Sequence, residues 1–179
     1  MKVFIAGPRI VREIDKNIIF KLENICDKNY EILIGDAEGI DSCVQKFLQF
    51  KLYKNVIVFA SKGIARNNYG DWKIEKVEVS NQVTGFEFYA QKDLQMAKKA
   101  DVGFMIWNGK SKGTFNNIIN LLEFDKQVVL YYLPNQKVYY FKKKDELKEF
   151  LVTNVKLDSK LKKLLNEKEI KSFFQTCLF

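Results

Sequence analysis

Three glycine-bearing segments of the sequence hold residues suited to binding an anion. They span residues 7–9, 35–41 and 108–114. Glycine lets a ligand oxygen approach the backbone closely, and hydroxyl groups such as those of Ser111 and Thr114 can donate to that oxygen. This chemistry predicts the binding of a phosphate group. The candidate binding residues in these segments are Gly7, Pro8, Arg9, Gly35, Asp36, Ala37, Gly39, Asp41, Gly109, Lys110, Ser111, Gly113 and Thr114.

Arginine is rare in the chain, so its positions are informative. The arginines are Arg9, Arg12 and Arg66, and all other basic side chains are lysines. Arg9 directly follows the first glycine, and its planar guanidinium can hold a phosphate through two hydrogen bonds. We therefore expect Arg9 to contact the ligand. Arg66 fits a phosphate contact and an exposed surface position about equally well.

The chain contains no histidine, which excludes several kinds of chemistry. Ser–His and Cys–His nucleophile pairs, a histidine general base and histidine-ligated zinc are all absent. The three cysteines are far apart and form no C-x-x-C, so neither a zinc ribbon nor a thioredoxin-type motif is present. We expect no metal and no cofactor, and any catalysis must use carboxylates, lysines, hydroxyls or backbone dipoles.

Glu87 and Asp93 are the weak catalytic candidates among the carboxylates. A carboxylate in a crevice can act as the nucleophile in N-glycosidic bond exchange. The two residues lie on one predicted helix, but six positions correspond to a rotation of about 240°, so they do not share a face. A structural role in the first helical turn remains an alternative for Glu87.

Five short apolar runs alternate with amphipathic segments and must position these residues. The runs span residues 2–6, 31–34, 55–59, 102–107 and 127–133. The alternation predicts a Rossmann-like α/β fold, with a mainly parallel sheet of about five strands and helices on both faces. The three glycine segments each follow a strand and precede a helix. They therefore meet in a crevice at the carboxyl ends of the strands, where helix N-termini favour an anion.

Two further segments depart from this alternation. Residues 60–82 are polar and show little periodicity, which predicts a long lid or binding loop. Residues 134–179 are rich in lysine and predict an extension, with an edge strand near 138–141 and two helices, packed on the nucleotide-binding domain 1–133. The lysine enrichment is typical of a solvent-exposed helix face. The alternative is that these lysines contact nucleic acid.

Length and composition set the remaining expectations. The chain has 179 residues, is 47% hydrophobic and carries a net charge of +8, which suffices for a folded domain with its own core. The apolar run at the start is too short for a signal peptide, and no stretch approaches membrane-spanning length. We expect a cytoplasmic protein that contacts no membrane. Both a monomer and a homo-oligomer are compatible with the sequence.

The standard nucleotide-binding motifs do not match this sequence. The Walker pattern requires glycine five residues before the Gly-Lys-Ser of residues 109–111, and Phe104 stands there instead. No G-x-G-x-x-G follows the first predicted strand. These absences argue against an ordinary kinase, ATPase or dinucleotide-dependent dehydrogenase.

Residues 1–133 resemble the SLOG superfamily, a group of Rossmann-like domains that unites the DNA-processing protein A family with the LOG phosphoribohydrolases. The resemblance rests on three ordered segments: residues 5–9 read IAGPR, residues 35–41 read GDAEGID, and residues 109–114 read GKSKGT. The first is similar to the Gly-Ser-Arg of the DNA-processing branch, with Pro8 in place of serine. The second is similar to the Gly-x-Ala-x-Gly-Ile-Asp of that branch.

This resemblance implies a nucleotide or nucleotide-derived ligand, with its phosphate on the segment before Thr114. LOG enzymes carry Pro-Gly-Gly-x-Gly-Thr-x-x-Glu, whose final glutamate serves ribose handling and N-glycosidic cleavage, and Asn117 stands at that position here. Their upstream Arg-Lys pair corresponds in part to Lys92 and Asp93. An amide keeps hydrogen bonding but is no base. We therefore expect a sensor or accessory module; the alternative is an N-glycosidic hydrolase or transferase of phosphoribohydrolase or deoxyribosyltransferase type, acting on nucleoside monophosphates.

Overall fold

The fold is a Rossmann-like α/β sandwich around one seven-stranded sheet. The computed structural model describes residues 1–80 and 82–176. The strands are β1 (Lys2–Ala6), β2 (Glu31–Ile34), β3 (Val56–Ser61), β4 (Lys73–Val77), β5 (Val102–Trp107), β6 (Gln127–Tyr132) and β7 (Lys137–Phe141). The helices are α1 (Lys16–Asp27), α2 (Ile40–Phe50), α3 (Gly85–Lys99), α4 (Lys112–Glu123), α5 (Lys144–Asn154) and α6 (Ser159–Thr176). The predicted fold class is therefore correct.

The strand order explains where a ligand can bind. The sheet runs β4-β3-β2-β1-β5-β6-β7, and all neighbours are parallel except the antiparallel pair β6 and β7. From β1 the chain builds outward to β4, and then it returns to the other side of β1 to add β5. Loops that leave β1 and β5 diverge at this reversal, which opens a crevice at the carboxyl ends of the strands.

The prediction of about five strands was too low, because β4 and β7 complete the sheet. The segment 60–82 is not an irregular loop throughout: β4 lies within it and pairs with β3 from Ile57↔Lys73 to Ser61↔Val77. Its five residues, KIEKV, do not alternate strictly between charged and apolar, and only Val77 of them is buried. The signal is weak because even Ile74 is 39% exposed on this edge strand. β7 occupies the position expected for an edge strand near 138–141.

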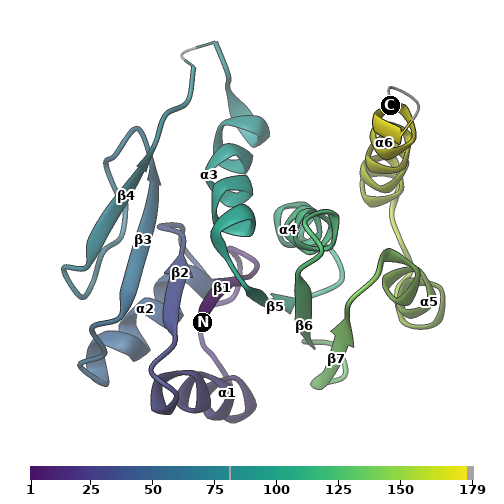
Figure 1. The fold of residues 1–179 in the computed structure, drawn as a ribbon. Helices are drawn as coiled ribbons and strands as arrows, with labels where there is room; N and C mark the ends of the chain where they lie inside the picture. Colours follow the sequence, from purple (N-terminus) through teal and green to yellow (C-terminus); the bar gives the residue numbers. More distant parts are fainter. Residues whose placement is uncertain (81, 177–179) are drawn as a thin grey trace.

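Helices cover both faces of the sheet, so the core has two layers (Figure 1). On one face, α1 and α2 bury side chains such as Ile18 and Val44 against Ile5. On the other face, α3 and α4 bury Met96 and Ile118 against residues that include Phe4. The sheet is thus sealed on both sides, which is the arrangement a parallel sheet requires.

The chain beyond β6 packs on the same core as α4. Apolar side chains of α5 and α6 join the buried cluster of α3 and α4; they are Leu147, Phe150, Leu151, Leu161 and Leu164. α5 and α6 lie beside β7 and α4 at the end of the sheet opposite β4 (Figure 1). Among the described residues, no helix combines the length and apolar character that a membrane crossing needs.

Candidate functional site

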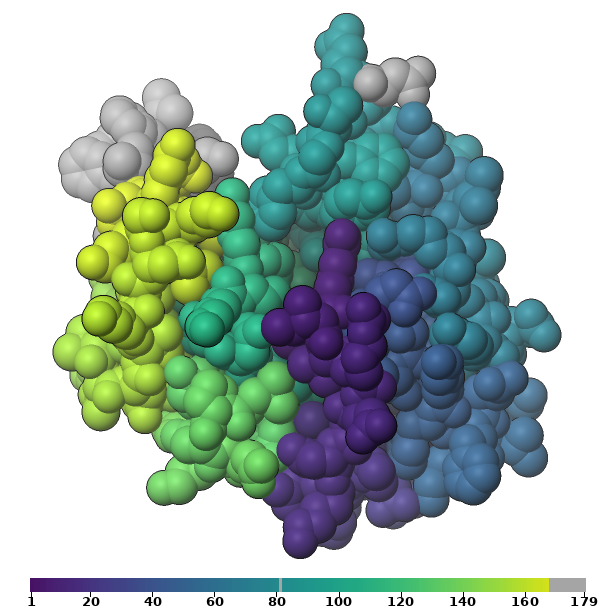
Figure 2. Space-filling view, turned by 180° about the vertical axis from the view of Figure 1, so that it is seen from behind, coloured from purple at the N-terminus to yellow at the C-terminus, as the bar shows by residue number. Residues whose placement is uncertain are grey.

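A cavity of about 520 Å³ lies at the carboxyl ends of the parallel strands, beside the reversal between β1 and β5. In the space-filling view, the N-terminal segment that includes the loop after β1 (purple) lies between the blue β2–α2 region and the green start of α4 (Figure 2). The predicted residues that line this cavity are Gly7, Pro8, Arg9, Gly35, Ala37, Asp41, Asp93, Lys110, Ser111, Gly113, Thr114 and Asn117. The three glycine segments therefore meet at one place.

Four predicted residues lie outside the cavity lining. Gly39 has a φ of +87°, and a Cβ there would meet the backbone of Pro8 and Arg9, so this glycine lets the second loop support the first. Gly109 has a φ of +76° and packs against Tyr132. Asp36 is buried beneath the cavity, as described below. Glu87 is exposed and lines a separate hollow between α3, α4 and α6.

Hydrogen bonds hold the loop before α4 in place and leave the hydroxyl hydrogen of Ser111 available. Asn108 Oδ1 accepts hydrogen bonds from the N–H groups of Lys110 and Ser111, at 3.1 and 2.9 Å. Trp107 Nε1 donates to the Ser111 carbonyl at 3.0 Å. Ser111 is the N-cap of α4: its Oγ accepts hydrogen bonds from Thr114 N and Thr114 Oγ1, at 3.4 and 3.0 Å. With both lone pairs engaged, the Ser111 hydroxyl hydrogen is available to an acceptor on a ligand.

The start of α4 presents backbone N–H groups to the cavity without obstruction. Gly113 lies in the first helical turn, where N–H groups have no intrahelical acceptor. A Cβ built on Gly113 would meet nothing within 4 Å, so a ligand can approach the backbone here. The positive end of the helix dipole adds to the attraction for an anion.

Two arginines lie against one tyrosine at the edge of the cavity. The guanidinium carbons of Arg9 and Arg66 lie 4.7 and 4.8 Å from the centre of the Tyr89 ring. Both distances are within the range for cation–π attraction. Arg66 also forms an ion pair with Asp36 at 2.7 Å, whereas Arg9 forms no salt bridge within 4.0 Å of a described acidic residue. The guanidinium of Arg9 therefore lines the cavity without an acidic partner among the described residues.

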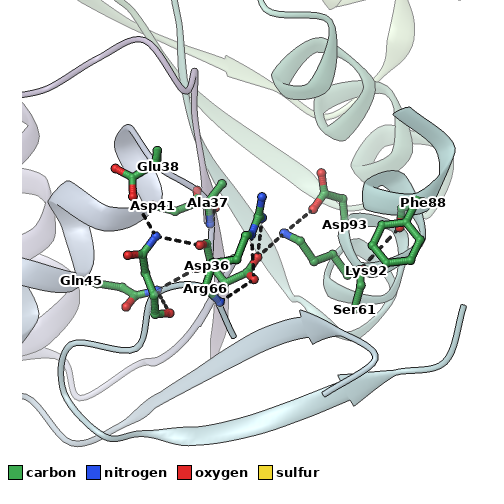
Figure 3. Close-up of polar contacts among 12 residues, drawn as sticks. Asp36, Ala37, Glu38, Asp41, Gln45, Ser61, Arg66, Phe88, Lys92 and Asp93 are labelled. Carbon is green, nitrogen blue, oxygen red and sulfur yellow. Dashed lines mark hydrogen bonds and ion pairs between the residues drawn. The ribbon is translucent and has the colours of Figure 1, made fainter. Parts of the chain in front are cut away.

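Beneath the cavity, Asp36, Arg66, Lys92 and Asp93 form an ionic cluster, in which Asp36 and Lys92 are buried and Arg66 is exposed (Figure 3). Arg66 Nε and Nη2 donate to the two oxygens of Asp36 at 3.1 and 2.7 Å, and Lys92 Nζ lies 3.5 Å from Asp36 Oδ1. Lys92 Nζ also donates to Asp93 Oδ1 at 3.2 Å. The Lys92 and Asp36 side chains are each only 4% exposed, so each charge needs its partners.

The cluster shifts the pKa of its members in different directions. Burial alone raises the pKa of Asp36, but hydrogen bonds from Arg66 and the charge of Lys92 outweigh it and hold the pKa below its ordinary value. Burial likewise opposes the charge of Lys92, yet Asp93, Asp41 and Asp36 together raise its pKa. Lys92 is thus a fixed internal cation.

Asp41 has fewer compensating contacts. Burial raises its pKa to about 6, although Lys92 and the Ala37 N–H act in the opposite direction. Its Oδ2 accepts the Ala37 N–H at 3.2 Å, which fixes the turn of the second loop. A Cβ on Gly35 would come within 2.7 Å of Lys92 Nζ and would also meet Asp41 Oδ2, so a side chain at that position would displace these two charged groups.

The segment after β3 is fastened to the second glycine loop. Asn67 Nδ2 donates to the Asp36 carbonyl at 2.9 Å. Gln45, which is fully buried, donates to the carbonyls of Gly35 and Asn67, at 2.8 and 3.2 Å, and accepts the Tyr69 N–H at 3.1 Å. No described residue of 60–82 lines the cavity. Arg66 contributes through Asp36 and Tyr89.

Two cavity-lining residues were given no role by the sequence analysis. Lys92 was noted only as a partial match to a family motif, although its position four residues before the buried Met96 on α3 is a signal that it faces the core. Tyr89 had no sequence signal, because its role depends on arginines from two distant loops.

The fold places the chain among Rossmann-like α/β proteins with a crevice at the strand-order reversal. No protein-family model matches the sequence, and no curated protein matches it either. Among solved structures, the chain is similar to DNA processing protein A from Helicobacter pylori, with a TM-score of 0.59 and 15% sequence identity. The match covers 93% of this chain and 79% of that one, and the reported subject of that structure is a single-stranded DNA binding mode. At this identity the likeness shows the shared fold.

Proposed function

We propose that the chain binds a nucleotide or nucleotide-derived ligand by its phosphate in the cavity at the carboxyl ends of the strands, as a sensor or accessory module. The main support for this proposal is that three strand-to-helix loops converge on one cavity of about 520 Å³. This volume lies within the ordinary range for small-molecule sites.

The donors around the cavity support a phosphate as the recognised group. The Gly113 backbone lies in the first turn of α4, the Ser111 hydroxyl retains a free hydrogen, and Arg9 has no described acidic partner within 4.0 Å. Each of these groups can donate to a phosphate oxygen, and charge-assisted bonds of this kind are the stronger ones. The position of Arg9 on the Tyr89 ring orients its guanidinium before a ligand arrives.

The N-glycosidic alternative has weaker support than simple binding. Glu87 lies outside the cavity, and Asp93 already accepts from Lys92 at 3.2 Å and from Asn117 at 3.4 Å. A carboxylate engaged in this way is a poor nucleophile. Asp41 lines the cavity, and its raised pKa of about 6 suits acid–base work near neutral pH.

Single-stranded DNA is the second candidate ligand, and the likeness to DNA processing protein A favours it. A nucleotide unit in the cavity would then be one residue of a longer strand. The net charge of +8 suits a polyanion. We also propose that residues 1–133 form a SLOG-type domain, on which residues 134–179 pack as an extension.

Isothermal titration calorimetry with nucleoside mono-, di- and triphosphates and a short deoxythymidine oligonucleotide tests the proposal. We expect a micromolar to millimolar binder that Arg9→Ala weakens about tenfold, because a charge-assisted hydrogen-bond donor is lost. The control is Arg12→Ala. The Arg12 side chain is 70% exposed, its ion pair with Glu38 is long at 3.8 Å, and it does not line the cavity.

The oligonucleotide arm separates the two candidate ligands. If the cavity binds mononucleotides, they displace the oligonucleotide, and its affinity falls only modestly with salt. If an extended strand is the ligand, affinity falls steeply with salt and mononucleotides compete poorly. Absence of any binding, or equal effects of the two arginine variants, would contradict the proposal.

A further inference from the structure

A second hollow adjoins the cavity beside the start of α4. It has a volume of about 340 Å³ and lies between α3, α4 and α6, and we call it the α6 hollow. Phe86 and Ala90 of α3 line both the cavity and the α6 hollow, so the two spaces are neighbours. Its volume is within the ordinary range for small-molecule sites. The lining of the α6 hollow includes Phe86, Glu87, Gln91, Asn116, Leu164 and Glu167.

The first turns of α4 form the ridge between the two spaces. Lys112 and Asn116, four residues apart, line the α6 hollow, whereas Gly113 and Asn117 line the cavity. Successive positions on a helix differ by about 100° in direction, so one helix start can present separate faces to two spaces. A phosphate held at the first turn of α4 would therefore lie about one helical turn, or 5 Å, from Asn116. The sugar of a nucleotide can span that step.

Asn116 is a buried polar residue without a hydrogen-bond partner. It is 6% exposed and lines the α6 hollow, and its side-chain amide forms no hydrogen bond with any residue that the structure describes. In contrast to Asn117 Oδ1, its polar atoms are not closed off from the space beside them. Buried polar groups almost always have partners, so a ligand in the hollow would explain this one. The amide offers that ligand one acceptor and one donor group side by side.

The other lining residues indicate what kind of group fits. Two carboxylates, Glu87 and Glu167, and one ammonium, Lys112, supply the charges, so the hollow disfavours a second phosphate. The Lys112 ammonium also lies over the Phe86 ring, 4.2 Å from its centre. Apolar side chains such as Phe86 and Leu164 form other parts of the lining. A flat, uncharged group with hydrogen-bond donors on its edge matches this combination.

We infer that the α6 hollow binds the base of the nucleotide whose phosphate lies at the start of α4. The inference rests on the proposed function and adds the class of base: one with an amino group beside a ring-nitrogen acceptor, as in adenine and cytosine. Asn116 donates to the ring nitrogen and accepts from the amino group, which is the pairing that asparagine makes with an adenine edge. Because Leu164 and Glu167 belong to α6, the extension 134–179 completes the site.

Calorimetry with two matched pairs of nucleotides, AMP with IMP and CMP with UMP, tests this inference. In each pair an oxygen replaces the amino group. We expect the wild-type chain to bind the amino form about tenfold or more tightly in at least one pair, since a bidentate contact to a base edge discriminates by about this factor. In Asn116→Ala the preference should fall to within about threefold. The control is Asn24→Ala on α1, which lines neither space and should keep the preference.

Gln91→Trp tests the location of the base without a change in the core, and it keeps the inference testable if Asn116→Ala does not fold. Gln91 is exposed on α3 and lines the α6 hollow but not the cavity. A tryptophan at this position fills the hollow. The affinity for the amino form should therefore fall about tenfold or more, and the preference within the pair should disappear. Circular dichroism and thermal melting check the folding of every variant.

The outcomes separate this inference from the proposed function. If nucleotides bind but the wild-type chain discriminates within neither pair, the inference is wrong and the proposed function stands. If the preference persists in either folded variant, Asn116→Ala or Gln91→Trp, the base is recognised elsewhere and the inference is again wrong. If no nucleotide binds, the proposed function fails and the inference fails with it.

Discussion

Two cavities of the same volume, about 520 Å³ each, lie at opposite ends of the parallel strands. The cavity at the carboxyl ends is lined by glycine turns and by the first turns of α3 and α4. The second, which we call the amino-end groove, is lined by strand starts such as Val102 and Gly103, by Lys21 of α1 and its C-cap Lys28, and by Tyr140 on β7. Volume alone does not distinguish them.

The difference lies in what the chain direction brings to each end. Parallel strands deliver helix starts, with their free N–H groups, to the carboxyl ends only. Two charged side chains that line the carboxyl-end cavity, Lys92 and Asp41, are buried, with no more than 7% of each residue exposed. None of the charged side chains that line the amino-end groove, namely Lys21, Lys28 and Asp101, is buried. Polarity of the backbone and buried charge, rather than space, mark the candidate site.

The largest expected effect is a loss of binding in Gly113→Val. The side chain has room, since a Cβ meets nothing within 4 Å, but it occupies the approach to the α4 N–H groups. Loss of two charge-assisted hydrogen bonds of about 2 kcal/mol each corresponds to roughly a 1000-fold lower affinity. Calorimetry measures this, and an unchanged melting temperature shows that the fold is intact. Undiminished affinity would remove the helix start from the site.

The next effect is a pH dependence of stability that arises from Asp41 in the carboxyl-end cavity. Asp41 titrates at a pKa of about 6 in the folded chain, against an ordinary value of 3.8. The folded state therefore binds the Asp41 proton more tightly than the unfolded state does. Below about pH 4 Asp41 does not lower the free energy of unfolding, and above about pH 6 it lowers that free energy by its full amount.

Asp41→Asn removes this titration. We expect the free energy of unfolding of the wild type, minus that of the variant, to fall by about 3 kcal/mol as the pH rises from about 3.5 to 7. Urea unfolding at a series of pH values measures it. A difference that rises with pH would mean that Asp41 is stabilised in its charged form, contrary to its burial.

A glycine that lines the amino-end groove should behave in the opposite way to Gly113. In Gly103→Ala the added Cβ would collide with the side chain of Leu121 on α4. Overpacking of this kind lowers stability by about 2 kcal/mol. Ligand affinity at a temperature where the variant is folded should be unchanged. A variant that loses affinity without losing stability would connect this groove to the ligand.

The smallest expected effect is that of Tyr140→Ser in the same groove. The tyrosine is 57% exposed on β7, so its loss should change the free energy of unfolding by no more than about 0.5 kcal/mol and should leave nucleotide affinity unchanged. Nucleotide titration and thermal melting of this variant give the affinity and stability with which Gly113→Val is compared. A clear drop in affinity would give the amino-end groove a role in binding.

The strands around the candidate site could be predicted because their burial on both faces leaves continuous apolar runs in the sequence. The expected runs 2–6, 31–34 and 102–107 coincide with β1, β2 and β5. β4 escaped prediction because an edge strand with charged, exposed positions has no such run. The helix α1 begins at Lys16, directly after its cap Asp15.

The site was predictable only as far as local sequence determines it. Glycine turns before helices are local features, so the loops at Gly7, Gly35 and Gly113 were found. Lys92 and Asp36 come from α3 and from the loop after β2, and their pairing depends on the packing of α3 across the sheet. Whether a carboxylate faces a ligand or a buried cation cannot be inferred from its type or spacing, and Asp36 and Asp93 illustrate this.

The pairing of β1 with β5 has a consequence for the synthesis of the chain. Val3 and Val102 are partners in the sheet, and the Lys2 N–H donates to Asp101 Oδ2 across a separation of 99 residues. A ribosome that has made the first hundred residues has produced both loops that carry Gly7 and Gly35, but not the strand that forms the other wall. The cavity is therefore complete only after α4 has emerged from the ribosome.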